Sequence, residues 1–528
     1  MKYLYGAAVQ GIQNFIFQTN ELKDIVGASE LVENICTVKF EELLRKHFQK
    51  DFSTLEDDEN AIINAAGNIK YIFESEEECA SVVKEFPKMI IQYAPGVTIS
   101  QAVVEYEQNQ DFSVIVDELE KKLRAQRNKP MQSTTLGLMG VLRSRRTNLP
   151  VVETERNRDN EIDYLDAATL AKRYHVKNGH KMERRNVIKL AKEAFGKNNL
   201  KLDEVALDID DMTGSNDWVA VIHADGNGLG QVVQKIGSKK DKYKSFSKKL
   251  DQATKAAAVD AFNSLAKNNN WNIIPIRPII LGGDDFTVIC RADLALDYVT
   301  TFMENFEKYT SFDELEGVFL NNEKKLTACA GIAFIKSSYP FFYGYNLAEA
   351  LCTRAKADAK KGMIQRNGQM SLPASCLMFH KVQDSFVENY GDIVQRELTP
   401  KENISFEFGP YYILPEQADK KQKWSVEKLK KHVNLLDGVG LKDEKKGNAV
   451  KSNLRNWLSL LHDNPGLADQ KRIRLKELLD TNNEDDKKLR AFVDEITAPT
   501  TSGFTTPCYD ILSLLTINNQ VTKKEAKE

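Results

Sequence analysis

The chain has 528 residues, and its 73 Lys and Arg against 76 Asp and Glu give a net charge of −3, which excludes a protein coated with positive charge for non-specific nucleic-acid binding. This length predicts about three to four domains. Seven scattered cysteines without a CxxC pair, no apolar run near about 18 residues and no signal peptide predict a cytoplasmic protein with reduced thiols, no zinc site and no membrane contact.

Residues 1–127 predict a first α+β domain. A strand that ends at Gln10-Gly11 is followed by IQNFIF and LKDIVGASELVENI, both with helical spacing. A glycine turn at Gly67-Asn68 then leads into another apolar strand. The further predicted elements are strands over Tyr3–Val9 and Val97–Val104 and a helix over Phe112–Leu123.

Residues 128–215 predict a small helical and loop insert. RNKPMQSTTLG and RSRRTNLPVVETERNRDN are polar and interrupted by proline, which favours loop, whereas YLDAATLAKRYH and NVIKLAKEAFG have helical spacing. Arg143, Arg145 and Arg146 form a basic cluster. A solvated face is the favoured interpretation of that cluster, and contact with RNA or another subunit is the alternative.

The domain over residues 216–398 opens with a buried strand that ends in a carboxylate. Val219–Ala224 is apolar throughout and runs into Asp225, and a glycine-rich stretch follows before a helix begins near Leu229. A carboxylate at such a position can hold a metal ion while backbone N–H groups face phosphates. The alternative is a solvated aspartate in a turn.

A hairpin with two adjacent acids follows at Asn272–Cys290. β-Branched residues lead to a turn at Gly282-Gly283, and Asp284 and Asp285 come next. Burying two acids beside isoleucines costs several kcal/mol unless a cation is present. A divalent metal is the simplest cation, and the glycines leave room for a nucleoside triphosphate. An ordinary hairpin with solvated acids is the alternative.

The next elements complete a ferredoxin-like palm. Leu326–Ile335 predicts a strand and Asn346–Lys361 an amphipathic helix that carries Lys356 near its end. The order of strand, helix, hairpin, strand and helix predicts that Asp225, Asp284 and Asp285 converge on adjacent central strands.

The two α+β domains have similar spacing. Gln10 precedes Gly67 by 57 residues, and Asp225 precedes Gly283 by 58. This spacing places Gln10 opposite Asp225 and Asn68 opposite Asp284, so we infer an internal duplication whose first copy lost its metal ligands. Two unrelated α/β segments are the alternative.

Residues 399–528 predict a helical domain. VEKLKKHVNLLDGVG, AVKSNLRNWLSLLHD, ADQKRIRLKELLD and LRAFVDEI are amphipathic, and the last eight residues, VTKKEAKE, are expected to fray. His462-Asp463 forms an HD pair without further suitable ligands, so we interpret it as the end of a helix and not as a nuclease site.

Asp225, the GGDD motif at 282–285 and the helix Ala348–Lys356 resemble the GGDEF-like palm of polymerase-cyclases, which diguanylate cyclases share with the large subunit of type III CRISPR effector complexes. The CRISPR subunit is closer because GGDD is typical of it. LMFHKVQDS after the palm resembles its trailing strand, and IQNFIF and LKDIVGASELV resemble its first palm. The chain departs from many relatives in lacking a zinc-binding insert, and its first palm starts too early to leave room for an N-terminal HD nuclease.

The resemblance implies an α+β fold with two ferredoxin-like palms that face each other, the first degenerate, together with a C-terminal helical bundle that docks small subunits. The implied activity is synthesis of an oligoadenylate second messenger from ATP, with guide RNA, target RNA and other effector subunits as partners. Two Mg²⁺ or Mn²⁺ ions would bind Asp225, the Gly226 carbonyl, Asp284 and Asp285. Nucleotide contacts are expected from Asn227, Ser247, Gly282, Gly283 and Lys356.

Two other functions stay open from the sequence. The chain could be a scaffold of an RNA-guided complex whose palm binds ATP without turnover. A stand-alone palm cyclase that makes a cyclic dinucleotide or an adenylate conjugate would need the same carboxylates.

Overall fold

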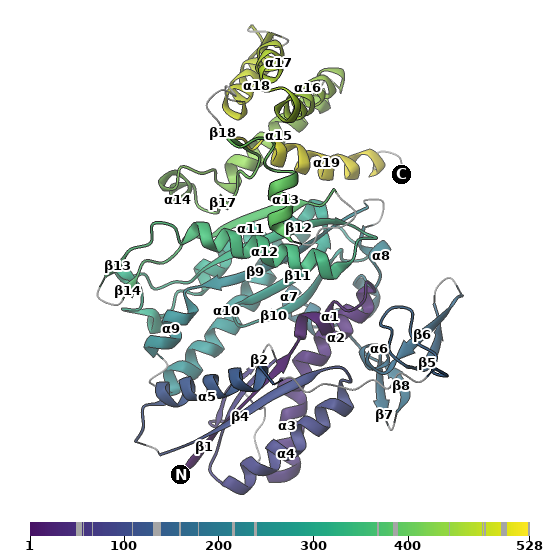
Figure 1. Cartoon of the computed structure of the whole chain (residues 1–528), viewed down its shortest axis with the longest axis vertical. Helices are drawn as coiled ribbons and strands as arrows, with labels where there is room; N and C mark the ends of the chain where they lie inside the picture. Colours follow the sequence, from purple (N-terminus) through teal and green to yellow (C-terminus); the bar gives the residue numbers. More distant parts are fainter. Residues whose placement is uncertain are drawn as a thin grey trace.

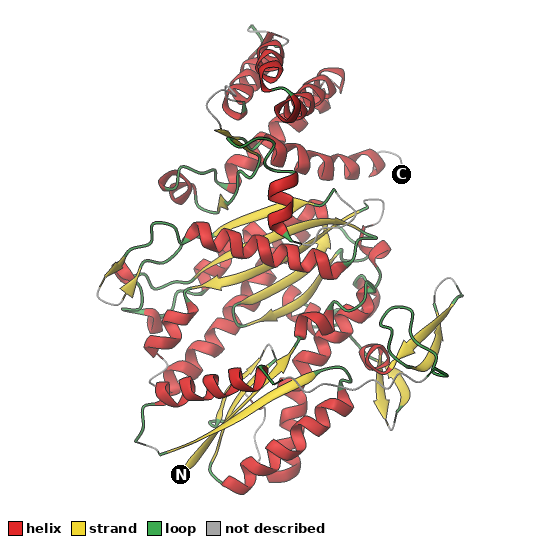
Figure 2. Cartoon of the chain, viewed as in Figure 1, coloured by secondary structure: helices red, strands yellow, loops and turns green. Residues whose placement is uncertain are grey.

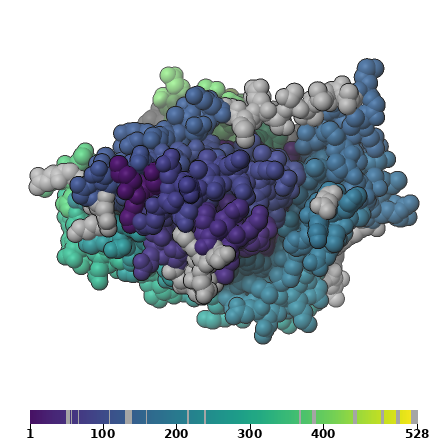
Figure 3. Space-filling view, turned by 90° about the horizontal axis from the view of Figure 1, so that it is seen from below, coloured from purple at the N-terminus to yellow at the C-terminus, as the bar shows by residue number. Residues whose placement is uncertain are grey.

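A computed structural model describes residues 1–48, 55, 58–65, 67–107, 109–129, 139–157, 160–177, 179–213, 217–236, 240–366, 369–383, 389–442, 444–477, 479, 482–497 and 504–525. Two α/β units are stacked along the long axis, with an insert beside them and a helical unit beyond the second (Figure 1). Each α/β unit has helices on both sides of a sheet (Figure 2). Seen along the long axis from below, the first unit covers much of the face, and the insert lies at its side (Figure 3).

The first palm is a four-stranded antiparallel sheet with the order β2-β3-β1-β4. Neighbouring residues on β1 point to opposite faces: Tyr5 stacks on Phe40 of α3, whereas Leu4 lies in a separate core with Leu119 of α5. The strands are β1 (Lys2–Gln10), β2 (Ala61–Ala65), β3 (Asn68–Phe73) and β4 (Thr98–Tyr106), and the helices are α1 (Ile12–Ile16), α2 (Leu22–Asn34), α3 (Phe40–Phe48), α4 (Glu76–Tyr93) and α5 (Phe112–Arg127).

The second palm repeats this topology in the order β10-β11-β9-β12 and adds β15 and β17 beyond β12. Phe286 of β11 stacks on Phe302 of α11, while His223 of β9 meets Tyr345 of α12, so α11 and α12 cover opposite faces. The strands are β9 (Trp218–Asn227), β10 (Ile276–Gly282), β11 (Asp285–Arg291), β12 (Thr327–Lys336), β15 (Cys376–Lys381) and β17 (Tyr411–Tyr412), with the small hairpin β13 (Gln365–Arg366) and β14 (Gln369–Met370). The helices are α9 (Leu229–Ile236), α10 (Lys240–Ala266), α11 (Ala295–Tyr309) and α12 (Phe341–Ala359).

Shared topology supports the duplication, but the register corrects the expected correspondence. Ala8 pairs with Asn68 in the first sheet, as Asp225 pairs with Asp285 in the second. The Val9 amide donates to the Gly67 carbonyl at 2.8 Å, as the Gly226 amide donates to the Asp284 carbonyl at 3.3 Å. The first palm therefore aligns with the second at a constant offset of 217 residues. Ala8, Gly67 and Asn68 are the counterparts of Asp225, Asp284 and Asp285. Matching Gln10 to Asp225 was wrong, because the strand continues two residues past the carboxylate; the counterpart of Gln10 is Asn227.

The insert contains two β-hairpins that the helical and loop prediction missed. VVETER, expected as loop, forms β5, whose side chains alternate between partly buried and exposed. The partly buried face carries Glu153 and Glu155, and the exposed face carries Val152, so the sequence lacks the apolar–polar alternation by which a half-buried strand is predicted. The expected helices are present but short. The elements are β5 (Val151–Arg156), β6 (Ile162–Asp166), α6 (Ala167–Arg173), β7 (Tyr174–Lys177), β8 (His180–Arg184), α7 (Lys189–Phe195) and α8 (Ile209–Thr213).

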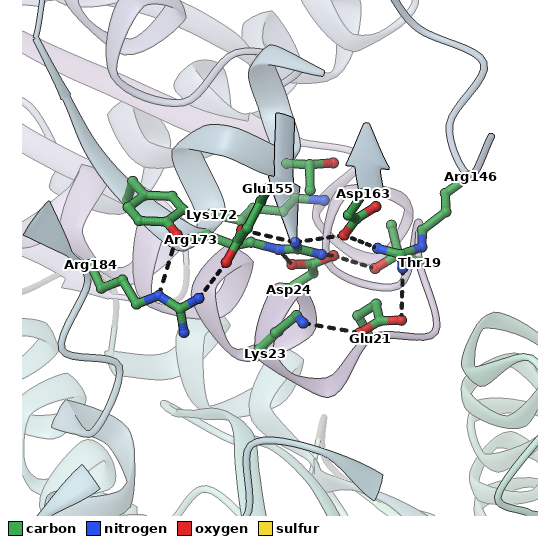
Figure 4. A network of polar contacts seen from close by, with 12 residues as sticks. Thr19, Glu21, Lys23, Asp24, Arg146, Glu155, Asp163, Lys172, Arg173 and Arg184 are labelled. Carbon is green, nitrogen blue, oxygen red and sulfur yellow. Dashed lines mark hydrogen bonds and ion pairs between the residues drawn. The ribbon is translucent and has the colours of Figure 1, made fainter. Parts of the chain in front are cut away.

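A buried polar network fastens the insert to the start of α2 (Figure 4). Arg173 donates to both carboxylate oxygens of Asp24 at 2.5 and 2.9 Å, and also pairs with Asp163 at 2.8 Å. Arg146 of the predicted basic cluster bridges Glu21 at 3.1 Å and Asp163 at 3.0 Å. Arg143 of the same cluster donates to the Asn148 carbonyl at 2.8 Å, so two members of the cluster are engaged within the chain. Of the expected loop RNKPMQSTTLG, Arg127 ends α5, and residues 130–137 lie outside the described residues.

The C-terminal unit is helical, as predicted, and it extends further than expected. α19 continues to Glu525, so VTKKEAKE is helical through its fifth residue. The sheet of the second palm also crosses the expected boundary at residue 398, because β17 pairs with β15. The elements are α13 (Tyr390–Arg396), β16 (Ile404–Ser405), α14 (Pro415–Lys420), α15 (Val426–Lys442), α16 (Glu444–Asp463), α17 (Pro465–Glu477), α18 (Glu484–Ile496), β18 (Phe504–Thr505) and α19 (Cys508–Glu525).

His462 lies at the end of α16, as expected. The seven cysteines are buried and free. In the described part of the chain, no helix is both long and apolar enough to cross a bilayer.

Candidate active site

Three aspartates meet at one edge of the sheet, where β9 ends and the antiparallel β11 begins. Asp225 and Asp285 are direct cross-strand partners, which puts their side chains on one face. Gly282 pairs with Asp285, so the hairpin turn consists of Gly283 and Asp284. The turn therefore lies one residue later than predicted. Asp284 reaches the site from the turn and not from a strand.

Two glycines shape this edge. Gly283 has φ +61°, a backbone conformation that side chains disfavour, and its carbonyl accepts a hydrogen bond from Thr254 of α10 at 2.5 Å. A Cβ atom on Gly226 would lie 2.9 Å from the Cβ of Asp284. Gly226 therefore lets the turn approach β9 closely enough for Asp284 to face Asp225.

Burial and neighbouring carboxylates raise the pKa values of Asp284 and Asp285. Burial, followed by the charges of Asp225 and Asp285, raises the pKa of Asp284 to about 7. Burial and the Asp225 charge raise the pKa of Asp285 to about 6, although Lys356 opposes this. A cation beside Asp284 and Asp285 would therefore stabilise their charged forms.

Lys356 of α12 supplies one cation. Its ammonium group forms an ion pair with Asp225 and donates to the Gly226 carbonyl at 3.0 Å. Burial alone would lower the pKa of Lys356, but the Asp225 carboxylate raises it. A cation is thus already held between two of the oxygen donors that were expected to bind metal.

The donor set fits Mg²⁺ or Mn²⁺, which prefer carboxylate and carbonyl oxygens. Within the described ranges, however, no three His, Cys, Asp or Glu side chains are already placed to hold an ion. Metal binding would therefore require Lys356 to release Asp225 and the carboxylates to rotate toward the ion.

Asn227 and Ser247, which were predicted to contact the nucleotide, do not contact the carboxylates in the described structure. Asn227 is buried and donates to Thr327 at 3.1 Å and to the Cys329 sulfur at 3.4 Å, so it joins β9 to β12. Ser247 is partly buried on α10, two helical turns before the Thr254 that touches the GGDD turn. The described contacts bring neither side chain to the carboxylates.

The sequence analysis did not predict the polar and aromatic contacts that lie next to the acids on β9 and β11. His223, two residues before Asp225, lies 3.1 Å from the hydroxyl of Thr287, two residues after Asp285. Its ring meets Tyr345 of α12 edge to face at 5.5 Å. Tyr345 in turn stacks on Phe17 of the first palm at 4.7 Å and accepts a hydrogen bond from Gln13 at 2.9 Å. The strands that carry the acids are therefore linked to the first palm.

A cavity of about 310 Å³ lies between the palms beside Asp285. The first palm contributes Gln10, Gln13, Glu33 and Arg127 to its wall, and the second contributes Ile279–Leu281, Asp285 and Tyr345. A molecule in this cavity would touch both palms and one of the acids.

Arg127 occupies the position in the first palm that Lys356 has in the second. Gln10 pairs with Thr98 in the first sheet, as its counterpart Asn227 pairs with Thr327 in the second. Arg127 follows Thr98 by 29 residues, and Lys356 follows Thr327 by the same number. The degenerate palm has thus lost its acids but kept a cation. A signal for this was present in the sequence, because each helix begins with phenylalanine, Phe112 or Phe341, 15 residues before its cation.

Comparison with known proteins agrees with this architecture. Residues 218–365 match the family described as Cas10/Cmr2, second palm domain. No curated protein sequence matches the chain.

The fold is similar to that of three solved structures. A chain of the Csm1-Csm4 cassette in complex with cA4 has a TM-score of 0.56 and 13% identity, with 98% of this chain and 69% of that chain covered. Csm1 in T.onnurineus gives the same TM-score, identity and coverage. A chain of the Csm1-Csm4 subcomplex in the type III-A CRISPR-Csm interference complex has a TM-score of 0.52 and 14% identity, again with 98% and 69% covered. Residues 218–365 therefore match the second palm domain of the Cas10/Cmr2 family, in a chain whose fold is similar to that of Csm1.

Proposed function

We propose that the chain is a nucleotidyltransferase that joins ATP molecules into an oligoadenylate, with a cyclic oligoadenylate as the main product. The carrying observation is the group of three aspartates around one cation, beside a cavity walled by both palms. Acids with raised pKa values next to a cavity are typical of catalytic centres.

The three aspartates, the Gly226 carbonyl and Lys356 each have a role in the proposed reaction. The 3′-hydroxyl of one ATP attacks the α-phosphate of another; an O–P bond forms and pyrophosphate leaves. Asp225, Asp284, Asp285 and the Gly226 carbonyl would hold two Mg²⁺ or Mn²⁺ ions, which lower the pKa of the hydroxyl and stabilise the charge on the phosphate. Asp285 borders the cavity and would orient the attacking hydroxyl. Once released from Asp225, Lys356 would neutralise the triphosphate.

The cavity between the palms would bind the acceptor nucleotide. Its volume of about 310 Å³ is at the lower end of the range for small-molecule sites. Arg127, the counterpart of Lys356, would hold phosphates there without a metal, which accounts for a palm that lacks acids but keeps a cation.

We further propose that the chain acts in the cytoplasm as the large subunit of a type III CRISPR effector complex, with guide RNA and target RNA. The fold likeness to Csm1, which is solved with Csm4 and, in one such structure, with cA4, supports this assignment. A nucleotide-binding scaffold is the competing function. The observation that favours it is the Lys356–Asp225 ion pair, which blocks one of the expected metal ligands.

The test is incubation of the purified chain with labelled ATP and Mn²⁺, alone and with its effector subunits and cognate RNA, followed by mass spectrometry of the product. We expect an oligoadenylate and pyrophosphate, both lost in the double variant Asp284→Ala with Asp285→Ala. The control is Glu76→Ala with Glu77→Ala, which removes two adjacent exposed acids from α4.

The double aspartate variant should remain folded, because it removes acids that repel each other. Product formation that survives in this variant would refute the assignment of the acids. ATP binding without product under every condition would establish the scaffold function.

A further inference from the structure

A cavity with a volume of about 810 Å³ lies far from the carboxylates, between the second palm and the helical unit. We call it the rear cleft. The palm lines it with Trp218, Lys336, Tyr339 and Lys381, and the helical unit lines it with Arg455, Phe406, His462 and Tyr509, among others. Trp218 begins β9 seven residues before Asp225, which is roughly 23 Å along a strand. The rear cleft is therefore separate from the candidate active site.

Three cations converge in the rear cleft. Burial, and then the charges of Lys336 and Arg455, lower the pKa of Lys381 to about 8. Lys336 has an acid partner, Asp217, at 3.0 Å. Lys381 instead donates to the neutral hydroxyl of Thr516 at 2.5 Å. Among the described residues, neither Lys381 nor Arg455 forms an ion pair, so positive charge in the cleft is left uncompensated.

The acid on the wall, Glu397, accepts a hydrogen bond from the Tyr509 hydroxyl at 3.4 Å and lies 3.7 Å from the His380 ring. The charges that act on Lys381 are those of Lys336 and Arg455, and no carboxylate is among them. Clustered ammonium and guanidinium groups repel each other, so a cluster of this kind is most stable with an anion bound.

Aromatic rings accompany the cations. The ammonium groups of Lys336 and Lys381 lie 4.7 and 4.3 Å from the centre of the Trp218 ring. Tyr339, Phe406 and Tyr509 also face the cleft. Cations for phosphates and aromatic rings for a planar base are the combination by which proteins bind nucleotides.

We propose that the rear cleft is a second ligand site that binds a nucleoside phosphate, with Lys381 and Arg455 holding the phosphates. A volume of about 810 Å³ falls within the range for small-molecule sites and suits one nucleotide. A bound ligand would touch the sheet through Lys381 and helix α16 through Arg455. Its binding would therefore tie the helical unit to the second palm.

The test is isothermal titration calorimetry of the full chain in EDTA, where metal-dependent chemistry is absent. The chain carries Arg127→Gln with Lys356→Gln, so that nucleotide binding between the palms is weakened. ATP and inorganic tripolyphosphate are the probes. We expect saturable binding of ATP that becomes at least about tenfold weaker on adding Lys381→Gln or Arg455→Gln, since each removes a charge-assisted contact. Lys488→Gln, an exposed lysine on α18, is the matched control and should leave the affinity unchanged.

The two probes distinguish the source of the phosphate. Tighter binding of ATP than of tripolyphosphate supports a nucleotide site with the base on the aromatic wall. Equal binding of both, or binding of tripolyphosphate alone, overturns the nucleotide assignment and leaves a phosphate site. Absence of binding, or affinities that Lys381→Gln and Arg455→Gln do not change, overturns the site itself. None of these results depends on turnover, so the proposed nucleotidyltransferase activity stands or fails separately.

Discussion

At the scale of single residues, the candidate active site depends on how closely one backbone turn approaches a neighbouring strand. Asp284 faces Asp225 because Gly226 has no side chain between them, and Gly283 adopts the positive φ that the turn needs. Burial raises the pKa values of Asp284 and Asp285, and the neighbouring carboxylate charges raise them further. Small changes of shape should therefore affect the chemistry more than the fold.

We predict that Gly226→Ala reduces product formation by about two orders of magnitude, because the added methyl group would lie 2.9 Å from the Cβ of Asp284 and push the turn away. Steady-state product formation at saturating ATP and Mn²⁺ measures this. Gly230→Ala is the control, since nothing lies within 4 Å of a Cβ there. Wild-type activity in Gly226→Ala would show that the approach of the turn does not matter.

A residue outside the site should govern part of the pH dependence of stability. Burial lowers the pKa of His380 on β15 from 6.5 to about 4, so the folded chain holds it neutral. The unfolded chain takes up a proton below about pH 6.5, so this residue's contribution of up to about 3 kcal/mol is present above that pH and is lost as the pH falls toward 4.

We therefore predict that His380→Phe flattens the loss of thermal stability between pH 6.5 and pH 4.5, because phenylalanine preserves the stacking on Tyr509 and cannot be protonated. Thermal midpoints by calorimetry at both pH values measure the effect. His180→Gln, an exposed histidine on β8, should leave the slope unchanged. An unaltered slope in His380→Phe would mean that other groups carry the acid sensitivity.

At the scale of elements, the insert and the first palm act as one unit because of Arg173. This side chain is 5% exposed and contacts Asp24, which is fully buried, together with Asp163 and Glu155 (Figure 4). Both strands of the β5–β6 hairpin and the start of α2 thus contact one guanidinium group. Removing the positively charged partner of a buried carboxylate leaves an uncompensated charge in the interior and destabilises the fold.

We predict that Arg173→Ala destabilises the first palm and insert by about 3–5 kcal/mol, because it leaves Asp24 charged and buried without its partner. Denaturant titration followed by hydrogen exchange at α2 measures this. Arg184→Ala removes an exposed arginine from the same network and should cost less than about 1 kcal/mol. Equal costs for the two variants would show that burial of the pair is unimportant.

At the scale of the whole molecule, the two palms form one candidate site although only one keeps the acids. The first palm places Arg127 on the cavity beside Asp285, and its Phe17 and Gln13 contact Tyr345 of the second palm. The degenerate copy thus lines the proposed acceptor site, and the rear cleft lies between the helical unit and the opposite ends of the strands of the second palm.

We predict that Arg127→Gln raises the KM for ATP about tenfold or more, because it removes a charged contact to the acceptor phosphates, while product formation stays metal-dependent. Initial rates over a range of ATP concentrations measure this. Arg124→Gln, an exposed arginine one turn earlier on α5, is the control. An unchanged KM in Arg127→Gln would place the acceptor nucleotide elsewhere.

The sequence by itself determined the elements of the second palm and the identity of its acids. The strand before Asp225, the GGDD hairpin and the helix that carries Lys356 all rest on local signals: runs of apolar residues, a glycine turn and helical periodicity. Spacing alone also indicated that the first palm is a copy. Such signals depend only on neighbouring residues within one element, so they can be recognised before the fold is known.

Only the tertiary structure decided how distant residues meet. The register of the duplication shifted by two residues from Gln10 to Ala8, because spacing between motifs does not say where a strand ends. The ion pair of Lys356 with Asp225, the place of Arg127 on the cavity between the palms and the convergence of Lys381 with Arg455 in the rear cleft each join residues from separate elements. These contacts depend on packing and strand order, which no local pattern encodes.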